Sequence, residues 1–217
     1  MYVQGRVKVV TLVKICGITN LADARVAAEA GADLLGFNFY RASPRYIAPL
    51  EARRIIDELP EGVMPVGLFV NEESPERVAE IADAAGVRAV QLHGDEAPEY
   101  CRALEGRFVI KALRVREGFR PESVRDYATE AVLLDGFSLE AYGGTGKTFD
   151  WTAAREASRL VPKLFLAGGL SAANVGEAVK LVRPYAVDAC SSVERAPGIK
   201  DASRLRAFIS AVREVKE

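Results

Sequence analysis

A lysine and a cysteine two positions apart, Lys14 and Cys16, are the residues whose types and spacing point most directly to acid–base chemistry. The β-branched stretch 9–13 predicts a strand that ends near Cys16, and the pattern from Asn20 onward predicts a helix. Side chains alternate along a strand, so the ammonium and the thiol share one face and Ile15 the other. A cation beside a thiol favours the thiolate, which can act as a general base. The alternative is a buried cysteine with a packing role, since cysteine is among the residue types most often buried.

The composition narrows the class of protein that could use these residues. The chain has 217 residues, a formal net charge of −1 and a pI near 6.0, which argues against a protein that coats nucleic acid or an anionic membrane. No apolar run approaches the ~20 residues that a bilayer span needs, and no signal-peptide pattern opens the chain. Three cysteines without paired spacing suit the reducing cytoplasm, and the single histidine gives no zinc motif. We therefore expect a soluble cytoplasmic protein without a metal, a nucleic-acid partner or a membrane partner.

Short apolar stretches alternate with helical patterns along the chain, eight of each. This α/β alternation predicts right-handed parallel crossovers, and eight units can close into a (β/α)8 TIM barrel. A doubly wound open sheet is the alternative. We expect residues 11–217 to form a single barrel domain and residues 1–10 a short N-terminal extension. The expected strands are 12–16, 34–40, 65–70, 89–92, 109–113, 131–134, 163–167 and 186–189, and the expected helices are 20–30, 49–59, 75–85, 97–105, 121–128, 151–159, 172–181 and 201–214.

In a barrel of this type the active site lies in the loops that follow the strands. Polar and glycine residues concentrate at these positions, whereas the opposite loops carry ordinary turn residues. Among them are Asp135 after the sixth strand and Asp188 at the eighth. The other residues at these strand ends are Cys16, Gly17, Asn38, Arg41, Arg45, Asn71, Glu72, His93, Gly94, Asp95, Arg114, Gly168, Gly169, Cys190, Ser191 and Ser192.

Two glycine-rich segments bear on phosphate binding. Gly168 and Gly169 follow the seventh strand and run straight towards a helix, where backbone N–H groups and the helix dipole favour an anion. Phosphate sites in barrels commonly combine the loops after strands seven and eight, which pairs these glycines with Ser191 and Ser192. A plain tight turn is the alternative. The second segment, 142–148, lacks the spacing of a nucleotide-binding phosphate loop, and we interpret it as a glycine-rich lid after the sixth strand.

The motifs, in their order along the chain, resemble those of the phosphoribosylanthranilate isomerases of tryptophan biosynthesis. The resemblance runs from about residue 13 to the end of the chain and is far more specific than any one motif. It rests on KICGIT (14–19), GFNFY (36–40), SPRYI (43–47), VGLFVN (66–71), VQLHGDE (90–96), GGTGKTFDW (143–151), LAGGL (166–170), VD (187–188), Glu194 and GIKD (198–201).

The resemblance implies an Amadori rearrangement that needs no metal or organic cofactor. N-(5-phosphoribosyl)anthranilate would be converted to 1-(2-carboxyphenylamino)-1-deoxyribulose 5-phosphate by a monomer or homodimer. The family roles fall on Cys16 as general base, Asp135 as general acid and Arg45 as the partner of the anthranilate carboxylate. The other residues implied to bind this small phosphosugar are Asp188, Gly168, Gly169, Ser191 and Ser192.

The chemistry of the residues is compatible with these roles. Opening the ribose ring needs an acid that holds a proton near neutral pH, and the apolar strand before Asp135 is a setting that favours a protonated carboxyl. The next step removes a proton from C2 of a Schiff base, and a thiolate next to Lys14 suits this task. Arg45 has an alternative role, which is to pin its loop through a salt bridge at the rim.

The chain departs from the family pattern at two places. Ser192 stands where a glycine is usual, and the segment 136–141 follows Asp135 where a small hydroxyl residue is more usual. A glycine in a phosphate loop allows positive φ or close backbone approach. Serine would therefore carry left-handed strain there, offset by an O–H contact to phosphate.

Two other functions fit parts of the pattern. A related histidine-pathway sugar isomerase would carry an aspartate at the end of the first strand, where this chain has Cys16. A catalytically silent phosphate-binding barrel would show no turnover and would be indifferent to loss of that cysteine. We interpret His93 as a packing or hydrogen-bonding residue at the rim and Cys101 as a buried residue within a helix.

Overall fold

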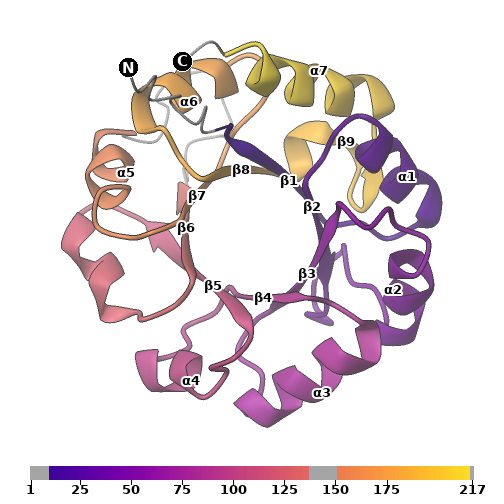
Figure 1. The fold of residues 1–217 in the computed structure, drawn as a ribbon, viewed down its shortest axis with the longest axis horizontal. Helices are drawn as coiled ribbons and strands as arrows, with labels where there is room; N and C mark the ends of the chain where they lie inside the picture. The colour runs from indigo at the N-terminus through magenta and orange to yellow at the C-terminus, as the bar shows by residue number, and fades with distance from the viewer. Residues whose placement is uncertain (1–9, 137–150, 216–217) are drawn as a thin grey trace, which may run out of the picture.

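The computed structural model describes residues 10–136 and 151–215, and they form a closed barrel of eight parallel strands ringed by helices (Figure 1). Each strand pairs with its neighbours in chain order, and β1 (Leu12–Cys16) closes the ring by pairing with β8 (Ala186–Ala189). The predicted TIM barrel is confirmed. The doubly wound alternative is wrong, because an open sheet would leave these two strands unpaired. Of the expected extension at 1–10, only Val10 is described.

The strands form at the expected short apolar runs, and each observed boundary lies within two residues of its prediction. β1, β4 and β8 have the predicted bounds. The remaining strands between β1 and β8 are β2 (Leu34–Asn38), β3 (Met64–Phe69), β4 (Ala89–Leu92), β5 (Phe108–Val115), β6 (Ala131–Gly136) and β7 (Leu164–Ala167).

The helices begin at recognisable capping residues. The side chains of Asn20, Ser74 and Asp201 each accept a hydrogen bond from a backbone N–H in the first turn that follows them. In the described part of the chain, no helix is long and apolar enough to cross a membrane. The α-helices are α1 (Leu21–Glu29), α2 (Pro49–Ile56), α3 (Pro75–Ala85), α4 (Pro98–Arg102), α5 (Trp151–Ala157), α6 (Val175–Val182) and α7 (Ala202–Arg213).

Several segments differ from the sequence predictions, among them α2 and α4, which each end three residues before the expected ends at 59 and 105. The expected helix at 121–128 is a 3-10 helix, η1 (Pro121–Asp126), whose one buried residue is too small an apolar face to hold a longer α-helix on the barrel. The helix expected at 172 begins at Val175, because Ser171 and Asn174 form a turn in which Ser171 N–H donates to Asn174 Oδ1. After β8 the chain forms elements too short for periodicity to reveal, namely η2 (Ser191–Val193), β9 (Glu194–Ala196) and β10 (Ile199–Lys200).

Apolar side chains pack in two layers, one inside the barrel and one between the strands and the helices. The inner cluster includes Val66, Ile110 and Phe165, all fully buried. The outer cluster takes the alternate residues of the same strands, among them Ile15. The predicted faces of β1 are therefore confirmed, because Ile15 joins the outer core whereas Cys16 lines a cavity in the barrel mouth.

Candidate active site

A cavity of about 270 Å³ lies at the carboxyl ends of the strands, the end at which barrels of this type carry function. Its lining comes chiefly from β1, β2, β4, β6, β7 and β8 and from the loops that follow them. Arg41, Asn71 and Arg114, also at strand ends, are outside its described lining. The lining includes every residue singled out by the sequence as a site residue: Cys16, Arg45, Asp135, Gly168, Gly169, Asp188, Ser191 and Ser192.

Cys16 is the last residue of β1 and is only 6% exposed. A hydrogen bond from the Cys190 thiol, together with the charges of Lys14 and Lys200, holds the pKa of Cys16 well below its usual range, although burial opposes the shift. The same hydrogen bond raises the pKa of Cys190. These opposite directions favour the thiolate form at Cys16 and the thiol form at Cys190. The expected influence of Lys14 is present, and Lys200 adds a second cation that the sequence patterns did not indicate.

Lys14 and Asp188 form a buried ion pair beside the thiol, with Nζ 2.9 Å from Oδ2. Burial alone would lower the pKa of Lys14, but the charges of Asp188 and Cys16 outweigh it and raise that pKa above its usual value. Burial raises the pKa of the Asp188 carboxyl to about 7, against the opposing attraction of Lys14. Asp188 Oδ1 is buried and accepts no hydrogen bond from the described residues, so this oxygen is available to a ligand.

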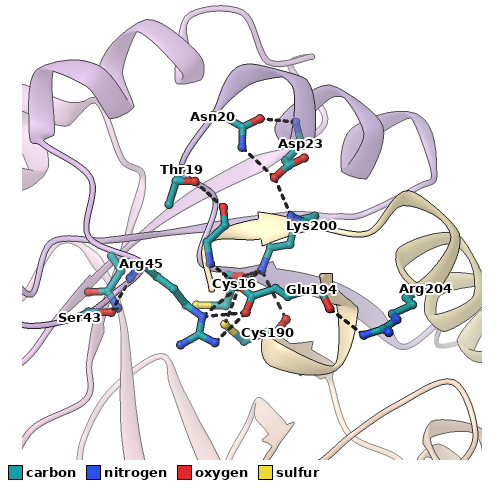
Figure 2. A network of polar contacts seen from close by, with 12 residues as sticks. Cys16, Thr19, Asn20, Asp23, Ser43, Arg45, Cys190, Glu194, Lys200 and Arg204 are labelled. Atoms are coloured by element: carbon teal, nitrogen blue, oxygen red, sulfur yellow. Dashed lines mark hydrogen bonds and ion pairs between the residues drawn. The ribbon is translucent and has the colours of Figure 1, made fainter. Parts of the chain in front are cut away.

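The β9–β10 hairpin brings Lys200 against Cys16 and Glu194 against Lys200 (Figure 2). Lys200 is buried, donates to the backbone oxygen of Cys16, and lies 2.9 Å from Glu194 Oε1. Burial would raise the pKa of Glu194, but hydrogen bonds from Arg45 and Lys200 hold it below its usual value. The hairpin thus supplies the second cation of the thiolate together with the carboxylate that balances it.

Arg45 makes a two-pronged contact with Glu194, as Figure 2 shows, with Nη2–Oε2 at 2.7 Å and Nε–Oε1 at 3.0 Å. The salt bridge considered as the alternative role of Arg45 is therefore present. Its Nη1 makes no hydrogen bond to any described residue, and the side chain lines the cavity. One edge of the guanidinium is held in place while the other can meet a carboxylate.

Asp135 on β6 is in contact with His93, whose Nε2 lies 3.2 Å from Asp135 Oδ2. His93 Nδ1 lies in turn 2.9 Å from Gln91 Nε2, and Gln91 Oε1 is buried without a partner among the described residues. In this arrangement the amide donates to Nδ1, and Nε2–H donates to the carboxylate. The amide oxygen and nitrogen of Gln91 are nearly indistinguishable in position, and exchanging them reverses the direction of both hydrogen bonds. Nδ1–H then donates to Oε1, and Nε2 accepts from a protonated Asp135.

The loop that carries His93 is fixed by a buried ion pair between Glu96 and Lys111, with Oε2 2.6 Å from Nζ. Glu96 also accepts hydrogen bonds from the backbone N–H groups of Asn71 and Gly94. These contacts tie the loops after β3 and β4 to each other. They consequently hold His93 in place relative to Asp135.

The glycine pair after β7 has backbone geometry that glycine adopts far more readily than other residues, with φ of +83° at Gly168 and +67° at Gly169. A Cβ at Gly168 would collide with the backbone of Gly136, whereas a Cβ at Gly169 would meet open space. Asn174 Nδ2 donates to the backbone oxygen of Gly169 at 3.0 Å. The glycines are therefore tied to the start of α6, but they do not run straight into it as expected.

Ser191 and Ser192 begin η2 on the neighbouring strand end. Neither has a positive φ, which Asn71 and Arg183 alone adopt among the described non-glycine residues, so the left-handed strain considered for Ser192 is absent. Its hydroxyl is buried and has no partner in the described structure. No hydrogen bond between described residues uses the backbone N–H of Gly169, Ser191 or Ser192. Unpaired donors around one cavity fit an anionic ligand.

The sequence patterns did not assign His93, Glu194, Lys200 or Cys190 a place around Cys16 and Asp135. Their sequence signals were a lone histidine, interpreted as hydrogen-bonding, and polar residues after the eighth strand. The contacts that give them a role join segments far apart in the chain. The expected lid at 142–148 lies outside the described residues. Within 10–136 and 151–215, no group of three or more His, Cys, Asp or Glu side chains could hold a metal ion.

A family model described as "N-(5'phosphoribosyl)anthranilate (PRA) isomerase" matches residues 13–211. The chain belongs to the phosphoribosylanthranilate isomerase family. It is therefore an isomerase of tryptophan biosynthesis. The N-(5'-phosphoribosyl)anthranilate isomerase of Trichlorobacter lovleyi is 54% identical over 202 residues, which cover 93% of this chain and 98% of that protein.

Solved structures of the family share the fold of this chain. The phosphoribosylanthranilate isomerase of Thermotoga maritima is 47% identical, covers 94% of this chain and 98% of its own, and superposes with a TM-score of 0.85. Monomers generated from that dimeric enzyme have also been solved. A family structure in complex with reduced 1-(o-carboxyphenylamino)-1-deoxyribulose 5-phosphate is 42% identical, with a TM-score of 0.81 and the same coverage.

We expect Cys16 to titrate well below the pKa of about 8.5 of an ordinary cysteine. A lowered pKa leaves the thiolate present at neutral pH, and the group gains its proton only as the pH falls through the lowered value. The measurement is the pH dependence of alkylation by iodoacetamide, followed by mass spectrometry on the tryptic peptide 15–25. Cys101, whose pKa burial raises, is the internal control in peptide 89–102. Equal pH profiles for the two cysteines would contradict the expectation.

Proposed function

We propose that the protein converts N-(5-phosphoribosyl)anthranilate to 1-(2-carboxyphenylamino)-1-deoxyribulose 5-phosphate, with Cys16 as general base and Asp135 as general acid. The observation that carries this proposal is the presence, in one cavity, of a thiol whose lowered pKa favours the thiolate and a carboxyl group in contact with His93. The reaction needs one proton acceptor and one proton donor around the same sugar. The family member solved with the reduced product analogue supports this choice of substrate.

The first step requires a proton on the ribose ring oxygen. Asp135 supplies it from the arrangement in which His93 Nε2 accepts a hydrogen bond from the protonated carboxyl. Protonation breaks the bond between C1 and the ring oxygen. The nitrogen lone pair then forms a Schiff base with C1, whose positive charge makes the C2 hydrogen acidic.

The second step removes that C2 proton. The Cys16 thiolate accepts it, and the electron pair of the C–H bond moves towards the iminium nitrogen to give an enolamine. The enolamine tautomerises to the C2 ketone of the product. Substrate and product are isomers, because Asp135 gives one proton and Cys16 gains one. Proton exchange through solvent returns both groups to their starting states.

Three parts of the cavity would hold the substrate. The Nη1 edge of Arg45 meets the anthranilate carboxylate while Glu194 holds the other edge. The N–H groups and hydroxyl around Gly169 and Ser192 meet the phosphate. Asp188 Oδ1 accepts a hydrogen bond from a ribose hydroxyl.

We also propose that the enzyme works in the cytoplasm as a monomer or homodimer. The three cysteines are all free thiols, which suits a reducing compartment. A solved relative is described both as a dimer and as monomers generated from it.

Loss of either proton-transfer group should lower kcat far more than it changes KM. Each such group contributes roughly 10²–10⁴-fold in rate, so Cys16→Ala and Asp135→Asn should each lose a factor in that range. The measurement is the change in anthranilate fluorescence with freshly generated phosphoribosylanthranilate. Cys101→Ala, outside the cavity lining, and Asp126→Asn, on the exposed end of η1, are the matched controls and should keep wild-type rates. Retention of more than about a tenth of wild-type kcat, with chemistry rate-limiting, would show that the altered residue does not have its assigned role.

Arg45→Lys should weaken substrate binding although it keeps the charge. A lysine cannot hold Glu194 with one edge and a ligand carboxylate with the other, and Arg45→Ala should bind more weakly still. The measurement is the calorimetric affinity for the reduced product analogue, with Arg41→Lys, outside the described cavity lining, as the control. Unchanged affinity in Arg45→Ala would mean that this residue only pins its loop to Glu194.

Ser192→Ala should bind substrate more weakly, by about the 1.5–3 kcal/mol of a hydrogen bond to a charged group. Its buried hydroxyl has no partner among the described residues and is available to the phosphate. Ser192→Gly should bind nearly as well as wild type, because the backbone N–H can then approach the anion more closely. Affinity for the same analogue tests this, with Ser123→Ala on η1 as the control. If alanine binds as tightly as serine, the hydroxyl makes no contact with the phosphate.

A further inference from the structure

Two of the three cysteines lie side by side at the mouth of the barrel. β1 and β8 are adjacent parallel strands in which Ile15 pairs with Ala189, so Cys16 ends β1 beside Cys190, the residue that follows β8. Neighbouring strands are about 4.7–4.9 Å apart, within the range of Cα separations that a disulfide spans. Figure 2 draws the two sulfur atoms close together, and both side chains line the active-site cavity.

The two thiols differ in protonation, as a reactive pair requires. Cys16 is linked to Cys190 by a side-chain hydrogen bond, and its lowered pKa favours the thiolate, which is the nucleophilic form. The hydrogen bond to Cys16 and burial raise the pKa of Cys190, which favours its thiol form, and its Sγ also lies 3.9 Å from Glu194 Oε1. A small oxidant that enters the cavity therefore meets a thiolate with a second thiol in contact with it. Cys101 takes no part, since it is buried in α4 and is not among the residues that line the cavity.

We propose that Cys16 and Cys190 form a redox-modification site, in which a peroxide converts the two thiols to an intramolecular disulfide that a dithiol reverses. The consequence for activity rests on the function proposed above, because a disulfide leaves no thiolate to accept the C2 proton. The formation of the disulfide itself depends only on the geometry and reactivity of the pair.

The oxidation proceeds in two balanced steps. The Cys16 thiolate attacks one oxygen of hydrogen peroxide, which breaks the O–O bond and gives Cys16 sulfenic acid and hydroxide. The Cys190 sulfur then attacks the Cys16 sulfur, the S–O bond breaks, and the Cys190 proton leaves with the departing hydroxide as water. Two thiol sulfurs are oxidised and the peroxide is reduced. Reduction by dithiothreitol exchanges the protein disulfide for a cyclic disulfide of the reagent and restores both thiols.

The experiment treats the reduced full-length protein with a small excess of hydrogen peroxide, blocks the remaining thiols and maps the tryptic peptides. Trypsin places the three cysteines in separate peptides, 15–25, 89–102 and 181–195. In the wild type we expect a cross-link between 15–25 and 181–195, an activity loss of about tenfold or more, and recovery with dithiothreitol. Cys101→Ala should behave in the same way.

Cys190→Ser is the decisive variant, because serine keeps a hydrogen-bond donor beside Cys16 but cannot form the disulfide. Measured against its own reduced activity, it should be inactivated by peroxide without a cross-link. Its Cys16 should proceed to sulfinic acid, and dithiothreitol should no longer restore activity.

The possible results separate this inference from the proposed function. A wild-type protein that loses activity with Cys16 oxidised to sulfinic acid and no cross-link would overturn the redox site and leave the role of Cys16 intact. A cross-link formed in full with activity retained would support the redox site and overturn Cys16 as the general base.

Discussion

The buried negative charge of the Cys16 thiolate is the constraint on which the rest of the site depends. A charge removed from water is costly unless opposite charges and hydrogen bonds replace the solvent. Lys14 and Lys200 provide the positive charges, and each lysine has its own carboxylate partner, Asp188 and Glu194. The result is a buried network of alternating charges around the thiol, in which Arg45 adds a second cation to Glu194.

The barrel brings this series together from distant parts of the chain. Lys14 and Cys16 stand on the first strand, and the side chains that balance them stand on the eighth strand and in the hairpin after it. Closure of the ring between β1 and β8 therefore assembles the surroundings of Cys16, the proposed base, and Figure 1 shows these two strands side by side. Asp135, the proposed acid, lies separately on β6, where a histidine from the β4 end reaches its carboxyl group. One scaffold thus holds the proposed base and the proposed acid at fixed places around one cavity.

The sequence was sufficient to predict the fold and the residues around the cavity, because strand periodicity and the rule that barrel sites follow the strands are both local patterns. It could not reveal that Lys200 contacts the backbone of Cys16 and pairs with Glu194, or that His93 contacts Asp135. Those contacts form only when the barrel closes. They also depend on the β9–β10 hairpin, whose strands of three and two residues are too short to show hydrophobic periodicity in the sequence. The expectation of left-handed backbone strain at Ser192 was wrong for a related reason. The φ of Ser192 is set by the 3-10 turn of η2 and not by its residue type.

The central claim is that the cation-stabilised thiolate of Cys16 is the base that acts on the substrate. The most direct test compares the acidic limb of the pH profile of kcat/KM with the alkylation profile of Cys16, in the wild type and in Lys200→Met. The pH profile of kcat/KM reports the pKa values of groups in the free enzyme and the free substrate. The pKa values of the substrate are the same for the wild type and the variant. Our account predicts that removal of the cation moves both profiles to higher pH by the same amount. A kinetic limb that stays in place while the alkylation profile moves would contradict it.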